Sequence, residues 1–96
     1  MRRTPTHPGE ILAEDMAALN MSAAELARRL RVPTNRITGI LNGKRSVSAD
    51  TALRLGHFFG TSAEFWLNLQ KLYELRTAER SVGKAIAKLP RLKAAA

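Results

Sequence analysis

Short, uncharged polar side chains gather on one side of the segment from Thr34 to Asn42. Asn35, Thr38 and Gly39 share this side, whereas the solvent face of a helix usually carries charged residues. An Asn side chain pairs bidentately with N6 and N7 of adenine, and Thr contacts thymine methyls or base edges in the major groove. We therefore predict that Thr34, Asn35 and Thr38 contact the bases of double-stranded DNA.

Basic side chains accompany this segment: Arg36 lies within it, and Lys44 and Arg45 follow it. Beside a groove-bound helix such cations meet phosphates, which fixes the register but reads little sequence. Ser22 begins the preceding helix, where free N–H groups can hold a further phosphate. The residues expected to contact DNA phosphates are Ser22, Arg36, Asn42, Lys44 and Arg45. The alternative for the basic side chains is ordinary solvation of a charged surface.

Two short helices are predicted to position these side chains. A capping box of Ser22 and Glu25 opens the first, which carries apolar residues at i, i+3, i+4 and i+7 and ends near Arg31. The second runs from about Thr34 to Leu41. Arg31 stands where the turn usually has Gly, so we expect a left-handed residue that costs about 1 kcal/mol. Two helices joined in this way are typical of a DNA-reading helix-turn-helix.

The remaining elements are also predicted to be helical, because no stretch alternates with period two for long enough to indicate a strand. One helix begins at Pro8, which suits the first helical position. Another spans residues 48–60. The last begins with Thr61 as the cap of a second capping box and is expected to end near Arg80. The fold class predicted is all-α, a five-helix domain with a basic C-terminal tail.

The charge of the chain indicates its class of partner. Sixteen Lys and Arg against eight Asp and Glu give a net charge of +8, which favours a polyanion, most often nucleic acid. The net charge is +4 over residues 1–47 (8 − 4), −1 over 48–70 (1 − 2) and +5 over 71–96 (7 − 2). We assign residues 1–80 to a DNA-binding and dimerisation domain and 81–96 to a frayed or disordered tail, which is either solvated or a further partner contact.

Several classes are excluded by what the sequence lacks. It has no Cys, so we expect no disulfide and no thiolate zinc site, in keeping with a cytoplasmic protein. It has no apolar run of about 18 residues to span a membrane, and its N-terminus lacks the apolar part of a secretory signal. His7 and His57 are too far apart in sequence to form a metal cluster. No phosphate loop or Ser–His–Asp set is present, so we expect neither an enzyme nor a cofactor.

Four apolar residues on the last two predicted helices point away from their core faces. Scattered exposed apolar residues are normal, but several on a small domain favour a self-association surface. We therefore predict a homodimer whose interface includes Leu53, Phe58, Leu67 and Leu75.

These residues lie within motifs that resemble a known family. Ser22 to Leu41 resembles the Xre, or lambda-repressor-like, helix-turn-helix. Together with His7-Pro8-Gly9-Glu10-Ile11-Leu12, Leu41-Asn42-Gly43-Lys44-Arg45, Ala52-Leu53-Arg54-Leu55 and the run from Gly60 to Gln70, it resembles the HigA-type antitoxins over residues 7–79. The resemblance implies a dimer that binds a palindrome in its own promoter and neutralises HigB, a RelE-like mRNA endonuclease.

Two other functions remain open on the sequence alone. One is a stand-alone transcriptional repressor that has no cognate toxin. The other is RNA binding, in which the basic tail would matter more than the helix from Thr34 to Leu41. A toxin contact by the tail is a further possibility that the sequence does not decide.

Overall fold

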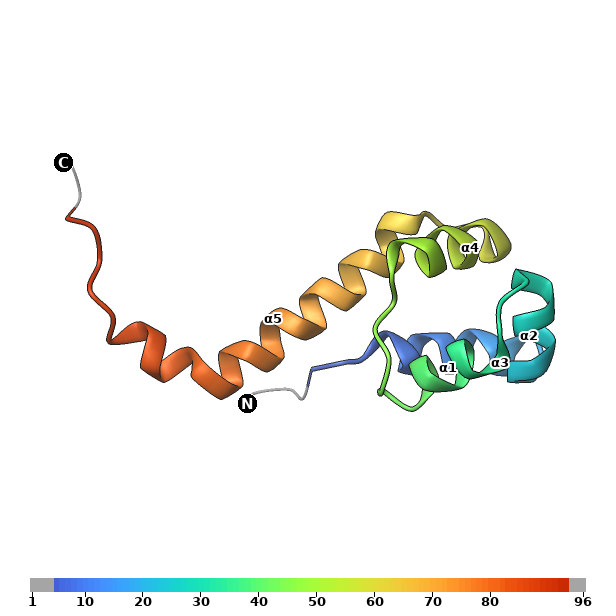
Figure 1. Ribbon diagram of the computed structural model, residues 1–96, viewed down its shortest axis with the longest axis horizontal. Coiled ribbons are helices and arrows are strands. Elements are labelled where there is room, and N and C mark those ends of the chain that lie inside the picture. Colours follow the sequence, from blue (N-terminus) through green and yellow to red (C-terminus); the bar gives the residue numbers. More distant parts are fainter. Residues whose placement is uncertain (1–4, 94–96) are drawn as a thin grey trace.

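The structure, a computed structural model, describes residues 5–93. This part of the chain contains five helices and no strand, which confirms the all-α prediction. The helices are α1 Pro8–Ala18, α2 Ala23–Leu30, α3 Thr34–Leu41, α4 Ala49–Phe59 and α5 Ala63–Ala87. Four of them form a small body, and α5 packs on this body through its first turns and then runs away from it (Figure 1). The molecule is therefore elongated, 54 × 27 × 22 Å.

Side-chain caps fix where the helices begin. The Ser22 hydroxyl accepts a hydrogen bond from the Glu25 N–H at 3.2 Å, as the sequence predicts. The prediction for α5 was wrong by one residue, because Ser62 and not Thr61 is its cap and accepts from the Phe65 N–H at 3.0 Å. The Thr61 hydroxyl instead accepts from the indole N–H of Trp66 at 3.1 Å. A fully buried indole needs such an acceptor, and this need decides the role of Thr61.

The turn between α2 and α3 is tight and partly strained. Arg31 has φ 58° and ψ 49°, the left-handed conformation expected for this position. Its N–H and that of Val32 donate to carbonyl groups of the last turn of α2, at Arg28 and Ala27. This termination directs the chain straight into α3, whose first residue is Thr34.

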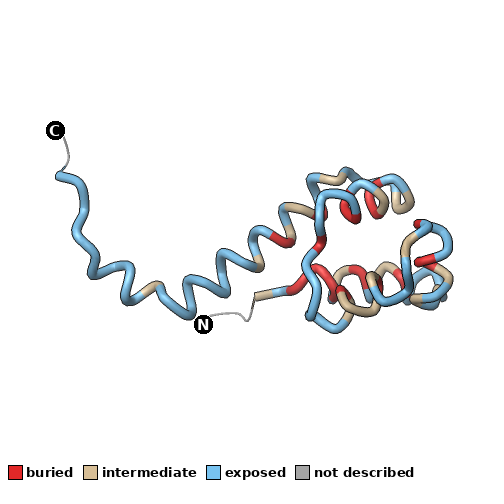
Figure 2. The backbone as a smooth tube through the Cα atoms, viewed as in Figure 1, coloured by how far each residue is buried: buried red, intermediate tan, exposed pale blue. Residues whose placement is uncertain are grey.

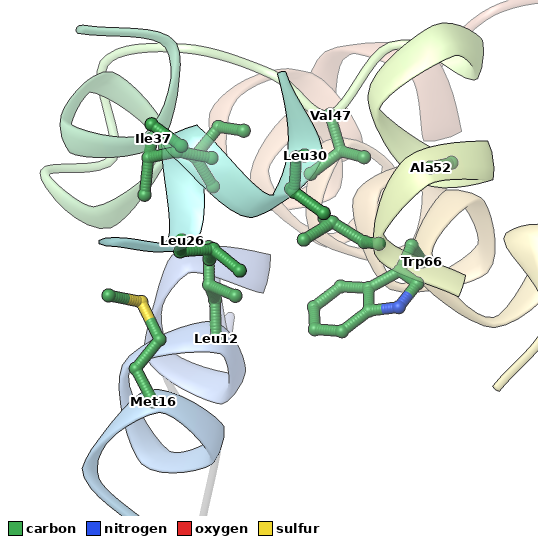
Figure 3. Packing of buried hydrophobic residues seen from close by; sticks show 11 residues of the cluster. Leu12, Met16, Leu26, Leu30, Ile37, Val47, Ala52 and Trp66 are labelled. Atoms are coloured by element: carbon green, nitrogen blue, oxygen red, sulfur yellow. The ribbon is translucent and has the colours of Figure 1, made fainter. Parts of the chain in front are cut away.

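One apolar core joins all five helices. Leu12, Met16, Leu26, Leu30, Ile37, Val47, Ala52 and Trp66 converge in its centre (Figure 3). Two glycines let helices approach closely around this core: a Cβ at Gly9 would overlap the Ile40 carbonyl oxygen of α3, and one at Gly56 would come within 2.8 Å of the backbone of Ser62 and Ala63. The spacing of α1 to α3 therefore depends on the absence of a side chain at Gly9.

The last helix is longer than predicted. It continues to Ala87, past the end expected near Arg80, with Gly83 inside it. Gly weakens a helix interior by about 1 kcal/mol but does not forbid the helix, and two good helix formers, Lys84 and Ala85, follow it here. Beyond Tyr73 almost every described residue is exposed (Figure 2). The division into a domain over 1–80 and a tail over 81–96 stays a prediction, and residues 94–96 lie outside the described part.

His7 caps the first helix with its ring. The ring Nδ1 accepts a hydrogen bond from the Gly9 N–H at 2.9 Å, and the backbone N–H of His7 donates to the Glu10 carboxylate at 3.2 Å. The ring is buried and lies edge-on to Tyr73 of α5, with centroids 4.8 Å apart. A nitrogen that accepts must be unprotonated. Burial lowers the pKa of His7 below 6.5, while the Glu10 carboxylate acts in the opposite direction.

The stability of the fold is expected to fall as the pH drops below about 6.5, because the folded state binds the His7 proton less readily than the unfolded state. The contribution of the neutral ring is complete above the unfolded pKa and is lost as the pH falls through the folded pKa. The slope of the free energy of unfolding against pH that this one group causes reaches at most about 1.4 kcal/mol per pH unit. Urea denaturation from about pH 8 to about pH 5 measures it.

The matched variant for this prediction is His7→Asn, which keeps a good capping side chain and removes the titration. Wild type should lose stability relative to this variant as the pH falls. Identical profiles for wild type and His7→Asn would contradict a pH-sensitive cap.

Candidate nucleic-acid interface

The outward face of α3 is set by what the helix buries. Ile37 and Ile40 are fully buried, and their contacts fix the rotation of the helix about its axis. Thr34 and Asn35 are exposed on the other side, and Thr38 is half-buried. The three residues predicted to contact bases therefore lie on one surface, and two of them are fully available to a partner.

The turn after α3 folds back onto the helix. The Gly39 carbonyl accepts hydrogen bonds from the backbone N–H groups of Lys44 at 2.9 Å and Arg45 at 3.0 Å. The side chain of Arg45 also packs over Gly39, where an added Cβ would lie 3.1 Å from Cβ of Arg45. Gly43, at φ 73°, allows the reversal. Lys44, Arg45 and Asn42 are exposed, so two cations lie next to the outward face of α3.

Ser22 is placed less favourably for a phosphate than the sequence indicated. Its hydroxyl already serves the capping box, and the Glu25 carboxylate accepts from the Ser22 N–H at 3.3 Å. A carboxylate thus lies at the N-terminus of α2, where a phosphate would otherwise benefit from the helix dipole. Ser22 is exposed and remains a predicted contact.

Arg36 is the one predicted phosphate contact whose guanidinium is paired with a carboxylate within residues 5–93. Its Nη1 donates to Oδ2 of Asp50 at 2.7 Å. The same oxygen accepts from Nε of Arg54 at 3.0 Å, and Nη1 of Arg54 donates to the Leu30 carbonyl at 2.7 Å. The hydrogen bond from Arg54, together with the Arg36 ion pair, holds the pKa of Asp50 below its ordinary value. This network, which we call the Asp50 network, joins α2, α3 and α4.

Sequence reasoning missed the Asp50 network, although one signal was present. Asp50 and Arg54 are spaced i, i+4 on a predicted helix, which favours an ion pair between them. Their link to Arg36 is long-range and has no sequence signal. The network borders a surface depression of about 500 Å³ that Arg31 and Arg45 also line.

The apolar residues predicted for a dimer interface divide into two groups. Leu53 and Leu75 are exposed, but Phe58 and Leu67 are partly buried and pack against the core. The larger apolar surface lies on α5 and was missed. It is a stripe, hereafter the α5 stripe, of exposed residues at heptad-like spacing: Phe65, Leu72, Leu75, Val82 and Ile86 on the helix, and Leu89 just after its end. The signal was a period of seven along residues 65–89, which the division at residue 80 concealed.

The α5 stripe lies opposite the side of α5 that packs on the body. Trp66 and Gln70 are buried on that inner side, and the Gln70 Oε1 accepts from the Val47 N–H at 2.9 Å. At 100° per residue, the α5 stripe from Leu72 onward falls on the far face of the helix, whereas Phe65 lies at its edge and its ring meets the Trp66 indole edge-on, with centroids 5.3 Å apart. Asn68 and Glu79 interrupt it, and Glu79 pairs with Arg76 at 3.2 Å.

Comparison with known proteins identifies the family. A helix-turn-helix family model matches residues 12–66. A solved structure from Coxiella burnetii, described as an addiction module antidote protein of the HigA family, is 55% identical, with a TM-score of 0.92 over 95% of this chain and 100% of that chain. The chain belongs to the HigA-type antitoxins of the Xre helix-turn-helix family.

Two further relatives of this HigA-type antitoxin are informative. The Pseudomonas aeruginosa antitoxin HigA, solved with the higBA promoter, is 44% identical, with a TM-score of 0.88 over 93% of this chain and 99% of that chain. Virulence-associated protein I of Dichelobacter nodosus is 47% identical over 77% of this chain and 69% of its own length. The first of these relatives was thus solved on promoter DNA.

No helix within residues 5–93 is long and apolar enough to cross a membrane. The same residues contain no group of three or more His, Asp or Glu side chains arranged to hold a metal ion.

Proposed function

We propose that this HigA-type antitoxin binds a palindromic operator as a homodimer, represses its own toxin–antitoxin operon and neutralises a HigB-type, RelE-like mRNA endonuclease. The observation that carries the DNA-binding part is the outward face of α3. It is uncharged and exposed at Thr34 and Asn35 and is bordered by Lys44 and Arg45. The relative solved with promoter DNA supports the same assignment.

The proposed readout divides the site residues by chemistry. Asn35 pairs with adenine, and Thr34 and Thr38 contact thymine methyls or base edges. Lys44 and Arg45 meet phosphates and set the register, with Ser22 and Asn42 as further phosphate contacts. In a dimer the two α3 helices lie about 34 Å apart, one turn of B-DNA.

The toxin part of the proposal rests on the family alone, since toxin binding has no local motif in this chain. It is tested by expressing the chain together with its neighbouring reading frame. Co-purification of a small RelE-like protein, and loss of its mRNA cleavage in the complex, are the results expected. A locus without such a partner would leave a stand-alone repressor instead.

The DNA part is tested by a footprint on the promoter upstream of the gene. Protection of a palindrome, with two half-sites about 10 base pairs apart, is expected. A scrambled duplex of equal length is the control. Equal binding to both duplexes would remove the assignment of sequence readout to α3.

We assign the homodimer contact to the α5 stripe, with Leu75 common to it and to the interface predicted from sequence. An amphipathic helix that leaves the body with an apolar face uncovered is suited to packing against a second copy of itself. Heptad-like spacing is the pattern by which two helices bury such faces together.

Leu75→Ala is expected to weaken dimerisation about thirtyfold. Leu75 is 51% exposed in the single subunit. Burying this exposed part in the dimer contributes about 1 kcal/mol per subunit, or about 2 kcal/mol per dimer. Sedimentation equilibrium measures the constant. Leu53→Ala, on α4 and outside the α5 stripe, is the matched control with no such loss. Equal effects of the two variants would argue against the α5 stripe.

A further inference from the structure

We infer that Asp50 is a positioning residue that holds Arg36 against α4 and keeps its guanidinium off the DNA backbone. The inference rests on the proposed function, because it concerns how the same interface meets DNA. It assigns Arg36 a different role from the phosphate contact expected from its place in the sequence. Arg36 then stabilises the packing of the helix-turn-helix. The α3 surface that meets DNA is formed by the uncharged residues Thr34, Asn35 and Thr38.

The Asp50 network is better fixed than an isolated surface ion pair. The guanidinium of Arg54 donates through Nη1 to the Leu30 carbonyl and through Nε to the Asp50 carboxylate. Arg54 therefore fixes the position of this carboxylate independently of Arg36. Isolated exposed pairs contribute little, but an interconnected set with a fixed carboxylate is the exception. The Arg36 side chain is only 29% exposed in this arrangement.

Asp50 lies near one of the cations assigned to the DNA backbone. It borders the same depression as Arg45. Its side chain is 56% exposed, so a substitution at Asp50 leaves the core intact. The carboxylate here retains Arg36, and this reduces binding that does not depend on the DNA sequence.

Neutralising Asp50 therefore has a defined consequence. Released from the carboxylate, each Arg36 gains one phosphate contact. A dimer gains two, which steepens the slope of log K against log salt by about 1.8. Between 50 and 200 mM salt, affinity for non-operator DNA should fall about twelvefold more for Asp50→Asn than for wild type.

The experiment measures binding of full-length wild type, Asp50→Asn, Arg36→Met and the double variant to a non-operator duplex across this salt range. Arg36→Met keeps the apolar stem and removes the charge. We expect the wild-type slope for Arg36→Met, a steeper slope for Asp50→Asn, and the wild-type slope again for the double variant. A purely structural role of the network would not move the slope in this order.

Glu64→Gln is the charge-matched control. Glu64 is exposed, makes no ion pair with any described residue and lies in the first turn of α5, which packs near the far end of α4 from Asp50. It should keep the wild-type slope. Circular dichroism checks that each variant is folded, and Asp50→Ser is a second neutral variant should Asp50→Asn unfold.

Three results would overturn the inference. One is an unchanged slope in folded Asp50→Asn or Asp50→Ser. A second is a steeper slope that persists in the double variant, since charge alone would then explain it. A third is a flatter slope for Arg36→Met, which would mean that Arg36 already touches phosphate in wild type. Failure of wild type to prefer its promoter would instead count against the proposed function.

Discussion

Replacing Gly9 with alanine is expected to lower the free energy of unfolding by about 3 kcal/mol, because the new methyl group would overlap the Ile40 carbonyl oxygen. A backbone carbonyl cannot rotate away as a flexible side chain can. Relief requires α1 and α3 to separate, which opens the core around Leu12 and Ile37. Because α3 carries the DNA-reading side chains, the same shift should also weaken operator binding.

Urea denaturation followed by circular dichroism, at one fixed protein concentration, measures this loss. The matched control is Gly83→Ala within α5, where an added Cβ meets nothing within 4 Å. Alanine is the better helix former, so that variant should be as stable as wild type or more stable. A Gly9→Ala protein within about 0.5 kcal/mol of wild type would contradict the close packing of α1 on α3.

Asn35→Ala is expected to weaken operator binding by about 2–6 kcal/mol, at least thirtyfold, because each half-site of a palindrome loses a bidentate base contact of about 1–3 kcal/mol. Binding to scrambled DNA should hardly change. The residue is exposed on α3 and alanine favours helix, so the fold should persist. Competition between operator and scrambled duplexes measures the ratio directly.

The companion variant for Asn35→Ala is Arg45→Ala, which removes a proposed phosphate contact from the same surface. It should weaken operator and scrambled DNA alike and flatten the salt slope by about 0.9 for each subunit. An Asn35→Ala protein that lost both DNAs equally would behave like this phosphate variant. Asn35 would then no longer be assigned to base recognition.

Local sequence signals were sufficient for most of the helical frame. The Ser22–Glu25 capping box, the proline at the start of α1 and the glycine after α4 each act within a few residues, so their effects can be read from the chain alone. The left-handed Arg31 also followed from its place between two short helices. The outward face of α3 was predictable because Ile37 and Ile40 fix its rotation.

The features missed depend on contacts between distant residues. Whether Arg36 faces DNA or Asp50 is decided by where α4 places Asp50, fourteen residues further along the chain. The role of Thr61 depends on the indole of Trp66. The length of α5 was underestimated because Gly83 was taken as an interruption, although a single glycine weakens a helix by only about 1 kcal/mol.

Trp66 gives the molecule an internal optical probe. It is the sole tryptophan of the chain, it is fully buried, and it joins α5 to the body beside α4. Its emission should therefore be blue-shifted in the native state and should move to longer wavelengths when water reaches the indole. Phe65 of the α5 stripe meets the indole edge-on, with ring centroids 5.3 Å apart, whereas Leu72, Leu75, Val82 and Ile86 lie on the opposite side of the helix. Dimerisation leaves the indole buried and should not move the emission to longer wavelengths, whereas detachment of α5 should. The emission of one unlabelled sample can thus distinguish dissociation of the dimer from detachment of α5 within a subunit.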